Sequence, residues 1–136
     1  MSVFVDTSAL YALLVETEEG HEQVSEAFRG LAESGRRLVT SNYVLLETTA
    51  LLQNRFGLQA VRDLESGIVP LFEIRWVSDA QHRQALERLF RMDRRGVSLV
   101  DCSSFHLMDT EGIREALSLD SDFSTEGFTV LPDQPT

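Results

Sequence analysis

Short apolar runs alternate along this chain with longer stretches whose apolar residues recur at helical spacing. The first apolar run covers residues 3–5 and is closed by Asp6. Later runs of strand length and composition cover residues 38–39, 72–77, 116–119 and 128–131. This alternation is typical of βαβ units and predicts a mostly parallel sheet.

The helical pattern is clearest where Val24, Ala27, Phe28 and Leu31 repeat with i, i+3, i+4, i+7 spacing. Further helices are expected from Thr7 or Ser8, over 42–56 and 58–68, from about Asp79, and after Val100, with Pro70 and Gly96 closing two of them. The stretch 42–56 is apolar around much of its circumference, which predicts burial on more than one side. Residues 1–131 are expected to form one domain, followed by a loose tail over 132–136.

Four acids occupy positions where solubility alone does not explain them. Asp6 and Asp120 each end an apolar strand, and the carboxyl ends of parallel strands form the edge where ligands bind. Glu47 lies within the apolar helix expected over 42–56. Asp101 lies in the first turn of its helix, where the helix dipole stabilises a carboxylate. The pattern predicts that these acids share one rim of the sheet.

Carboxylates brought close together repel one another unless a cation lies between them. Hard oxygen ligands without nitrogen or sulfur partners favour Mg²⁺ or Mn²⁺, and such ions assist phosphodiester hydrolysis. Each acid also has a simpler explanation. Asp6 and Asp101 could cap helices, Glu47 could extend its carboxylate to solvent or pair with an arginine, and Asp120 with Asp122 could form a turn.

Composition limits how such a protein could hold a nucleic acid. The 136 residues carry a net charge of −10, which excludes binding by bulk positive charge. All twelve basic residues are arginines, and the lack of lysine argues against receiver-like and haloacid-dehalogenase-type sites. Arg91, Arg94 and Arg95 are the best candidates for contacts with RNA phosphates. Alternatively, these three residues form a solvated helix end that complements the dipole.

Four segments resemble the motifs of PIN-domain endoribonucleases, and in particular the toxins of VapBC-type toxin–antitoxin pairs. Residues 3–8 (VFVDTS) resemble the opening strand with its first acid, and residues 40–47 (TSNYVLLE) resemble the segment with the second acid. Residues 99–102 (LVDC) are similar to the third motif, and residues 119–123 (LDSDF) to the closing one. Together the four motifs span nearly the whole chain in the family's order.

The resemblance implies a three-layer α/β/α sandwich on a five-stranded sheet of order 3-2-1-4-5. It implies that Asp6, Glu47, Asp101 and Asp120 hold Mg²⁺ or Mn²⁺, with Ser8 and Asp122 in support. Either Asp120 or Asp122 could supply the fourth ligand. The implied partners are an RNA substrate, a cognate antitoxin protein and a second copy of the chain.

The single Cys102 and the absence of a leader or a long apolar run indicate a cytoplasmic protein without a membrane segment. Trp76 and Phe123 are expected to pack in the core. A PIN-like module that binds RNA or a protein partner without cleaving remains the alternative to a nuclease.

Overall fold

The computed structural model describes residues 1–133 and contains a parallel sheet of five strands in the order β3-β2-β1-β4-β5. Residues 134–136 of the expected tail lie outside the described residues. The observed order confirms the predicted order 3-2-1-4-5. The strands are β1 (Ser2–Val5), β2 (Arg37–Ser41), β3 (Glu73–Arg75), β4 (Glu115–Leu117) and β5 (Thr129–Leu131).

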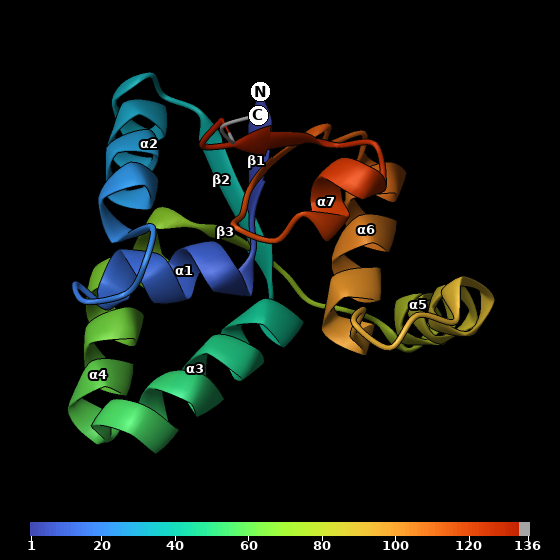
Figure 1. Cartoon of the computed structure of the whole chain (residues 1–136), viewed down its shortest axis with the longest axis horizontal. Coiled ribbons are helices and arrows are strands. Elements are labelled where there is room, and N and C mark those ends of the chain that lie inside the picture. Colours follow the sequence, from blue (N-terminus) through green and yellow to red (C-terminus); the bar gives the residue numbers. More distant parts are fainter. Residues whose placement is uncertain (134–136) are drawn as a thin grey trace.

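Helices cover both faces of the sheet and complete the three-layer sandwich (Figure 1). Helices α1 and α2 lie on one side of β1, whereas α6 and α7 lie on the other, with α5 packed outside α6. The helices are α1 (Thr7–Leu14), α2 (His21–Glu33), α3 (Asn42–Phe56), α4 (Leu58–Asp63), α5 (Asp79–Met92), α6 (Leu99–Glu111) and α7 (Asp122–Thr125).

The centre of the core is β1, whose residues Val3, Phe4 and Val5 are fully buried. Phe4 pairs in register with Val39 of β2 on one side and Ala116 of β4 on the other. Burial of each large apolar side chain contributes about 1.5–3 kcal/mol. Because the chain proceeds from β1 in both directions across the sheet, a crevice is expected at the carboxyl ends of β1 and β4.

Two predicted helix ends differ from the structure. The helix expected over 58–68 is α4, which changes to a π-helical turn over Leu64–Ile68, and Pro70 lies inside a 3₁₀ turn rather than closing the helix. Helix α5 ends at Met92 instead of Gly96, because Asp93 adopts a left-handed φ of 47°. None of the helices within residues 1–133 is long and apolar enough to cross a membrane.

Burial also corrects two expectations about apolar residues. Helix α3 buries one face through Val44, Thr48 and Leu52, whereas Leu46 is 71% exposed. The prediction of burial on more than one side is therefore wrong. Trp76, expected in the core, is 76% exposed because it follows the short edge strand β3, while Phe123 is fully buried as predicted.

Candidate metal centre

Asp6 directly follows β1 and is the first acid at the carboxyl edge of the sheet. It occupies the N-cap position of α1, yet its side chain makes no capping hydrogen bond. Instead, its Oδ2 atom accepts hydrogen bonds from Ser8 Oγ at 3.0 Å and Ser118 Oγ at 3.1 Å. The capping alternative for Asp6 is therefore wrong, and the carboxylate is held toward the end of β4.

Ser118 is a site residue that the sequence interpretation missed. Its hydroxyl oxygen also accepts a hydrogen bond from Asp120 N at 3.0 Å, and Ser8 Oγ accepts one from Leu119 N at 2.9 Å. The two hydroxyls thereby tie the loop after β4 to the end of β1. A lone hydroxyl inside an otherwise apolar strand run was the signal that could have identified Ser118.

Asp101 is placed at the start of α6 by a capping box with Ser98. Asp101 Oδ2 accepts from Ser98 N at 3.0 Å, and Ser98 Oγ accepts from Asp101 N at 3.0 Å. The capping explanation is thus correct for this residue, although it does not account for the other acids nearby. Burial raises the pKa of Asp101, and the charges of Asp120 and Glu47 raise it further, against the hydrogen bonds from Ser98.

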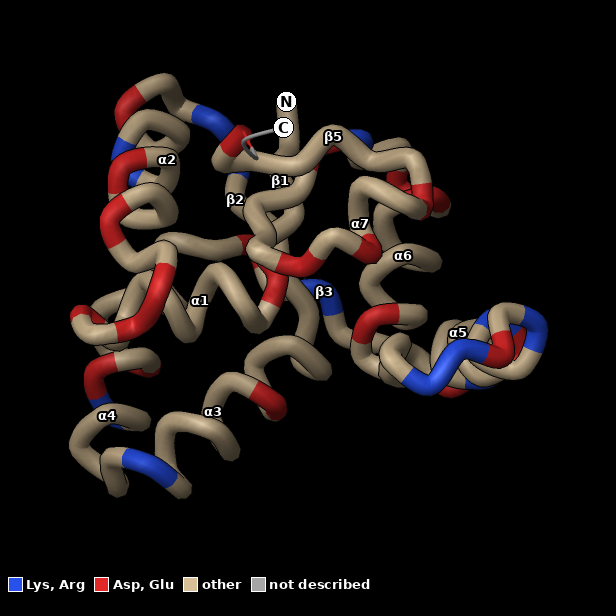
Figure 2. Tube along the Cα trace, in the orientation of Figure 1, with Lys and Arg blue, Asp and Glu red and all other residues tan. Residues whose placement is uncertain are grey.

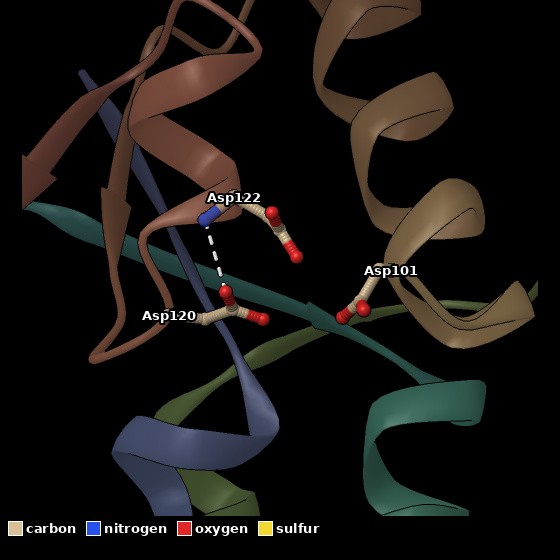
Figure 3. Close-up of side chains that lie close together, drawn as sticks. All are labelled: Asp101, Asp120 and Asp122. Atoms are coloured by element: carbon tan, nitrogen blue, oxygen red, sulfur yellow. Dashed lines mark hydrogen bonds between the residues drawn. The ribbon is translucent and has the colours of Figure 1, made fainter. Parts of the chain in front are cut away.

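Three carboxylates converge where α6 faces the loop after β4 (Figure 3). Asp101, Asp120 and Asp122 each offer an oxygen atom, and these three atoms lie within 4.8 Å of one another. Asp122 N donates to Asp120 Oδ1 at 2.9 Å, which holds the last two acids side by side. Both candidates for the fourth ligand therefore lie beside Asp101, and we call these three residues the acidic triad.

Asp6 and Glu47 stand outside the triad but remain within its electrostatic reach. Burial, followed by the charge of Asp101, raises the pKa of Asp6 to about 7, although hydrogen bonds from Ser8 and Ser118 oppose the rise. Glu47 is half-buried on α3 and influences the pKa of Asp101. The structure thus brings Asp101, Asp120 and Asp122 together, whereas Asp6 and Glu47 are linked to them through electrostatic interactions with Asp101.

The donor set suits a hard divalent cation. All the groups that converge are carboxylates, as Mg²⁺ and Mn²⁺ prefer, and no described histidine or cysteine joins the triad. The raised pKa values of Asp6 and Asp101 reflect buried negative charge that a cation would stabilise. Within residues 1–133, the only ion pair to the triad is Arg94 Nη2 with Asp122 Oδ1, at 3.4 Å.

The three arginines proposed for phosphate contacts occupy the end of α5 and the loop that follows it. Arg91 lies in the last turn of the helix, and Arg94 and Arg95 lie beyond it. Arg94 contacts the triad through Asp122. The structure therefore connects this basic segment directly to the acids.

Comparison with known proteins identifies relatives along nearly the whole chain. The model of the PIN domain family matches residues 3–127. The chain is 37% identical over 127 residues to the 23S rRNA-specific endonuclease VapC20 of Mycobacterium tuberculosis, covering 93% of this chain and 95% of the relative. It is 30% identical over 122 residues to ribonuclease VapC26 of the same organism, covering 87% and 86%.

Solved structures agree with these relatives. The crystal structure of M. tuberculosis VapC20, described as a sarcin-ricin loop cleaving toxin, has a TM-score of 0.81 and 35% identity, covering 93% of this chain and 96% of that chain. FitAcB from Neisseria gonorrhoeae shares the fold, with a TM-score of 0.68 and 18% identity over 96% of both chains. The matched family, the parallel sheet and the acids at its carboxyl edge all agree. The chain therefore belongs to the PIN-domain family, with relatives among the VapC nucleases.

Proposed function

We propose that this protein is a metal-dependent endoribonuclease that acts as the toxin of a toxin–antitoxin pair. The observation that carries the proposal is the acidic triad, which lies at the carboxyl edge of a PIN-domain sheet. The names of the two VapC relatives support RNA as the substrate. Retention of every acid in the four motifs favours cleavage over a binding module without activity.

We assign separate roles at the proposed metal centre to the acids and to the two serines. Asp101 and Asp120 would hold Mg²⁺ or Mn²⁺, with Asp6, Glu47 and Asp122 as direct or indirect ligands. A bound divalent ion would supply hydroxide at neutral pH and stabilise negative charge developing on the phosphate. Ser8 and Ser118 orient the Asp6 carboxylate by donating to its Oδ2 atom.

Ribosomal RNA is the substrate class to examine first. VapC20, which is 37% identical to this chain, is named as an endonuclease specific for 23S rRNA. Its solved structure is described as that of a toxin that cleaves one loop, the sarcin-ricin loop. We infer that this chain also recognises a loop in a structured RNA. Unpaired loop nucleotides expose base faces and edges that a protein can contact.

A protein antitoxin and a second copy of the chain are the proposed protein partners. The description of VapC20 as a toxin supports the antitoxin, because a cell that makes an enzyme that cleaves its own RNA needs an inhibitor of that enzyme. Exposed apolar side chains on α3 and α4 support the second copy. Leu46, Leu51, Phe56 and Leu58 are each between 46% and 71% exposed, more apolar surface than two short helices need to leave in water.

The decisive experiment incubates the purified protein with an RNA pool that includes ribosomal RNA, in Mg²⁺, Mn²⁺ or EDTA. We expect internal cleavage with either ion, none in EDTA, and loss of cleavage in Asp6→Asn. The matched control is Asp63→Asn, because Asp63 is an exposed acid at the end of α4, away from the edge. Cleavage that survives EDTA or Asp6→Asn would contradict the proposed chemistry.

A further inference from the structure

The basic segment after α5 carries charge that the fold does not use. Most arginines within residues 1–133 make ion pairs or hydrogen bonds with other elements, as Arg36 does with Glu115 and Arg88 with Glu126. Arg91 and Arg95 form no ion pair within the described part of the chain, and Arg94 pairs only with Asp122. Positive charge is therefore concentrated beside the acids of a chain whose net charge is −10 (Figure 2).

A hollow of about 440 Å³ lies at this end of α5. Its lining combines apolar residues with charged ones: Leu89, Phe90, Asp93, Arg94 and Arg95. Phe90 is 73% exposed, so its ring contributes little to the core. Asp93, in a left-handed conformation, ends the helix between the ring and the two following arginines, which line the same hollow. Asp93 adds one negative charge to a segment that carries three positive charges.

The position of the hollow relative to the acidic triad determines its candidate ligand. Arg94 lines the hollow and also contacts Asp122 of the triad at 3.4 Å. A polymer that passes from the triad into the hollow therefore meets a guanidinium first and an aromatic ring next. Guanidinium groups bind phosphates in a bidentate manner, and an exposed ring binds the face of a base.

We propose that this hollow seats one unpaired nucleotide of the RNA substrate, adjacent to the phosphate that is cleaved. The base stacks on Phe90, while Arg94 and Arg95 hold the phosphates on either side of it. This assignment rests on the proposed endoribonuclease function and specifies its substrate as RNA that is single-stranded beside the cut. A paired nucleotide would not fit, because its faces are covered by neighbouring base pairs.

The test measures binding of a short, labelled single-stranded RNA of mixed sequence by fluorescence anisotropy in EDTA, where metal-dependent cleavage is absent. Phe90→Ala is expected to weaken binding about 5- to 150-fold, the range observed for loss of one stacked base. Phe90→Tyr should retain the affinity, whereas Phe90→Leu should lose it, because stacking needs a ring. Equal binding by Phe90→Ala and the wild type would overturn the proposal.

Matched controls separate this hollow from general effects of exposed residues. Trp76→Ala removes another highly exposed aromatic ring and should leave RNA binding unchanged. Arg95→Gln should reduce the slope of log affinity against log salt by about 0.7, the value for one phosphate contact on single-stranded RNA. Arg62→Gln, at an exposed position on α4, should not change that slope.

Two comparisons distinguish failure of this inference from failure of the proposed function. If the wild type never cleaves RNA but Phe90→Ala still weakens binding, the nuclease proposal fails and the nucleotide site stands. If the wild type cleaves RNA while Phe90→Ala has unchanged KM, kcat and binding, the site is refuted alone. If Phe90→Ala binds RNA as the wild type does but loses affinity for a polyglutamate peptide, the nucleotide site is refuted and the hollow is instead a docking surface for an acidic protein.

Discussion

Acidic residues have opposite surroundings at the two ends of the strands, which we call the amino edge and the carboxyl edge of the sheet. At the amino edge, where the strands begin, acids are paired with arginines at or just before the start of β2. Arg37, at the start of β2, pairs with Glu73 at the start of β3 at 2.6 Å, and Arg36 pairs with Glu115 at the start of β4. The hydrogen bond from Arg37 lowers the pKa of Glu73 to about 2, and the charge of Arg37 lowers it further.

At the edge where strands end, acids face one another instead. The pKa of Asp6 is raised to about 7 and those of Asp101 and Asp122 are also raised, each principally by burial. Arg94 is the one arginine paired with the triad among residues 1–133. The difference supports the proposed metal centre, because a bound cation would stabilise the negative charge that this edge leaves without arginine partners, whereas the metal-free protein would be less stable for it.

The largest expected effect tests which acids of the triad hold the metal. Asp120→Asn should lower kcat/KM for RNA cleavage by about 100-fold or more, because metal ions stabilise the transition state by several kcal/mol. Asp122→Asn should have a smaller effect, since one oxygen of Asp122 is already paired with Arg94. Steady-state cleavage rates in Mn²⁺ measure both. A larger loss in Asp122→Asn would assign the fourth ligand to Asp122.

The second effect concerns the dependence of stability on pH at the carboxyl edge. Between about pH 4 and pH 7 the folded, metal-free protein keeps the Asp6 proton while the unfolded chain releases it. The folded state therefore binds more protons in this window, and its stability should fall as pH rises, by an amount on the order of 4 kcal/mol. Urea unfolding in EDTA across this range measures the slope.

Asp6→Asn is the matching variant for this measurement. An amide can still accept from Ser8 and Ser118 but does not ionise, so the slope should become flatter. Saturating Mn²⁺ should flatten the slope of the wild type as well, because a bound cation stabilises the ionised form. A slope that is the same for wild type and Asp6→Asn would show that Asp6 does not titrate in this window.

The smallest effect tests the amino edge. Glu115→Gln removes the partly buried ion pair with Arg36 and should lower the free energy of unfolding by about 1 kcal/mol, with no change in RNA cleavage. Chemical denaturation and the cleavage assay together measure the two outcomes. The two edges would not differ as described if Glu115→Gln impaired cleavage as strongly as Asp120→Asn.

Local sequence pattern predicted the alternation of strands and helices and singled out the candidate acids, whereas the strand order was implied by the resemblance to PIN-domain proteins. The placement of Asp6 after the run 3–5 and of Asp101 in the first turn of its helix was predictable because strand ends and helix starts are local features. The prediction that Asp120 ends its strand is wrong, because β4 ends at Leu117 and Asp120 lies in the loop that follows.

The existence of the helix expected over 58–68 was predictable, but its π-helical end was not, and that end begins at Leu64, which lies in a second small core cluster with Val15 and Leu52. The exposure of Trp76 depends on β3 being an edge strand, which no local pattern reveals.

The sequence by itself determined the alternation of strands and helices, the order of the four acidic motifs and the total charge. Only the tertiary structure decided that Asp122 joins Asp101 and Asp120, that Ser118 supports Asp6, and that a basic hollow adjoins the triad. The physical reason is that residue spacing controls which side chains share one element. Contacts between elements depend instead on how β1, β4, α5 and α6 pack, because packing decides which residues far apart in the sequence come close enough to repel, to form hydrogen bonds or to bury one another.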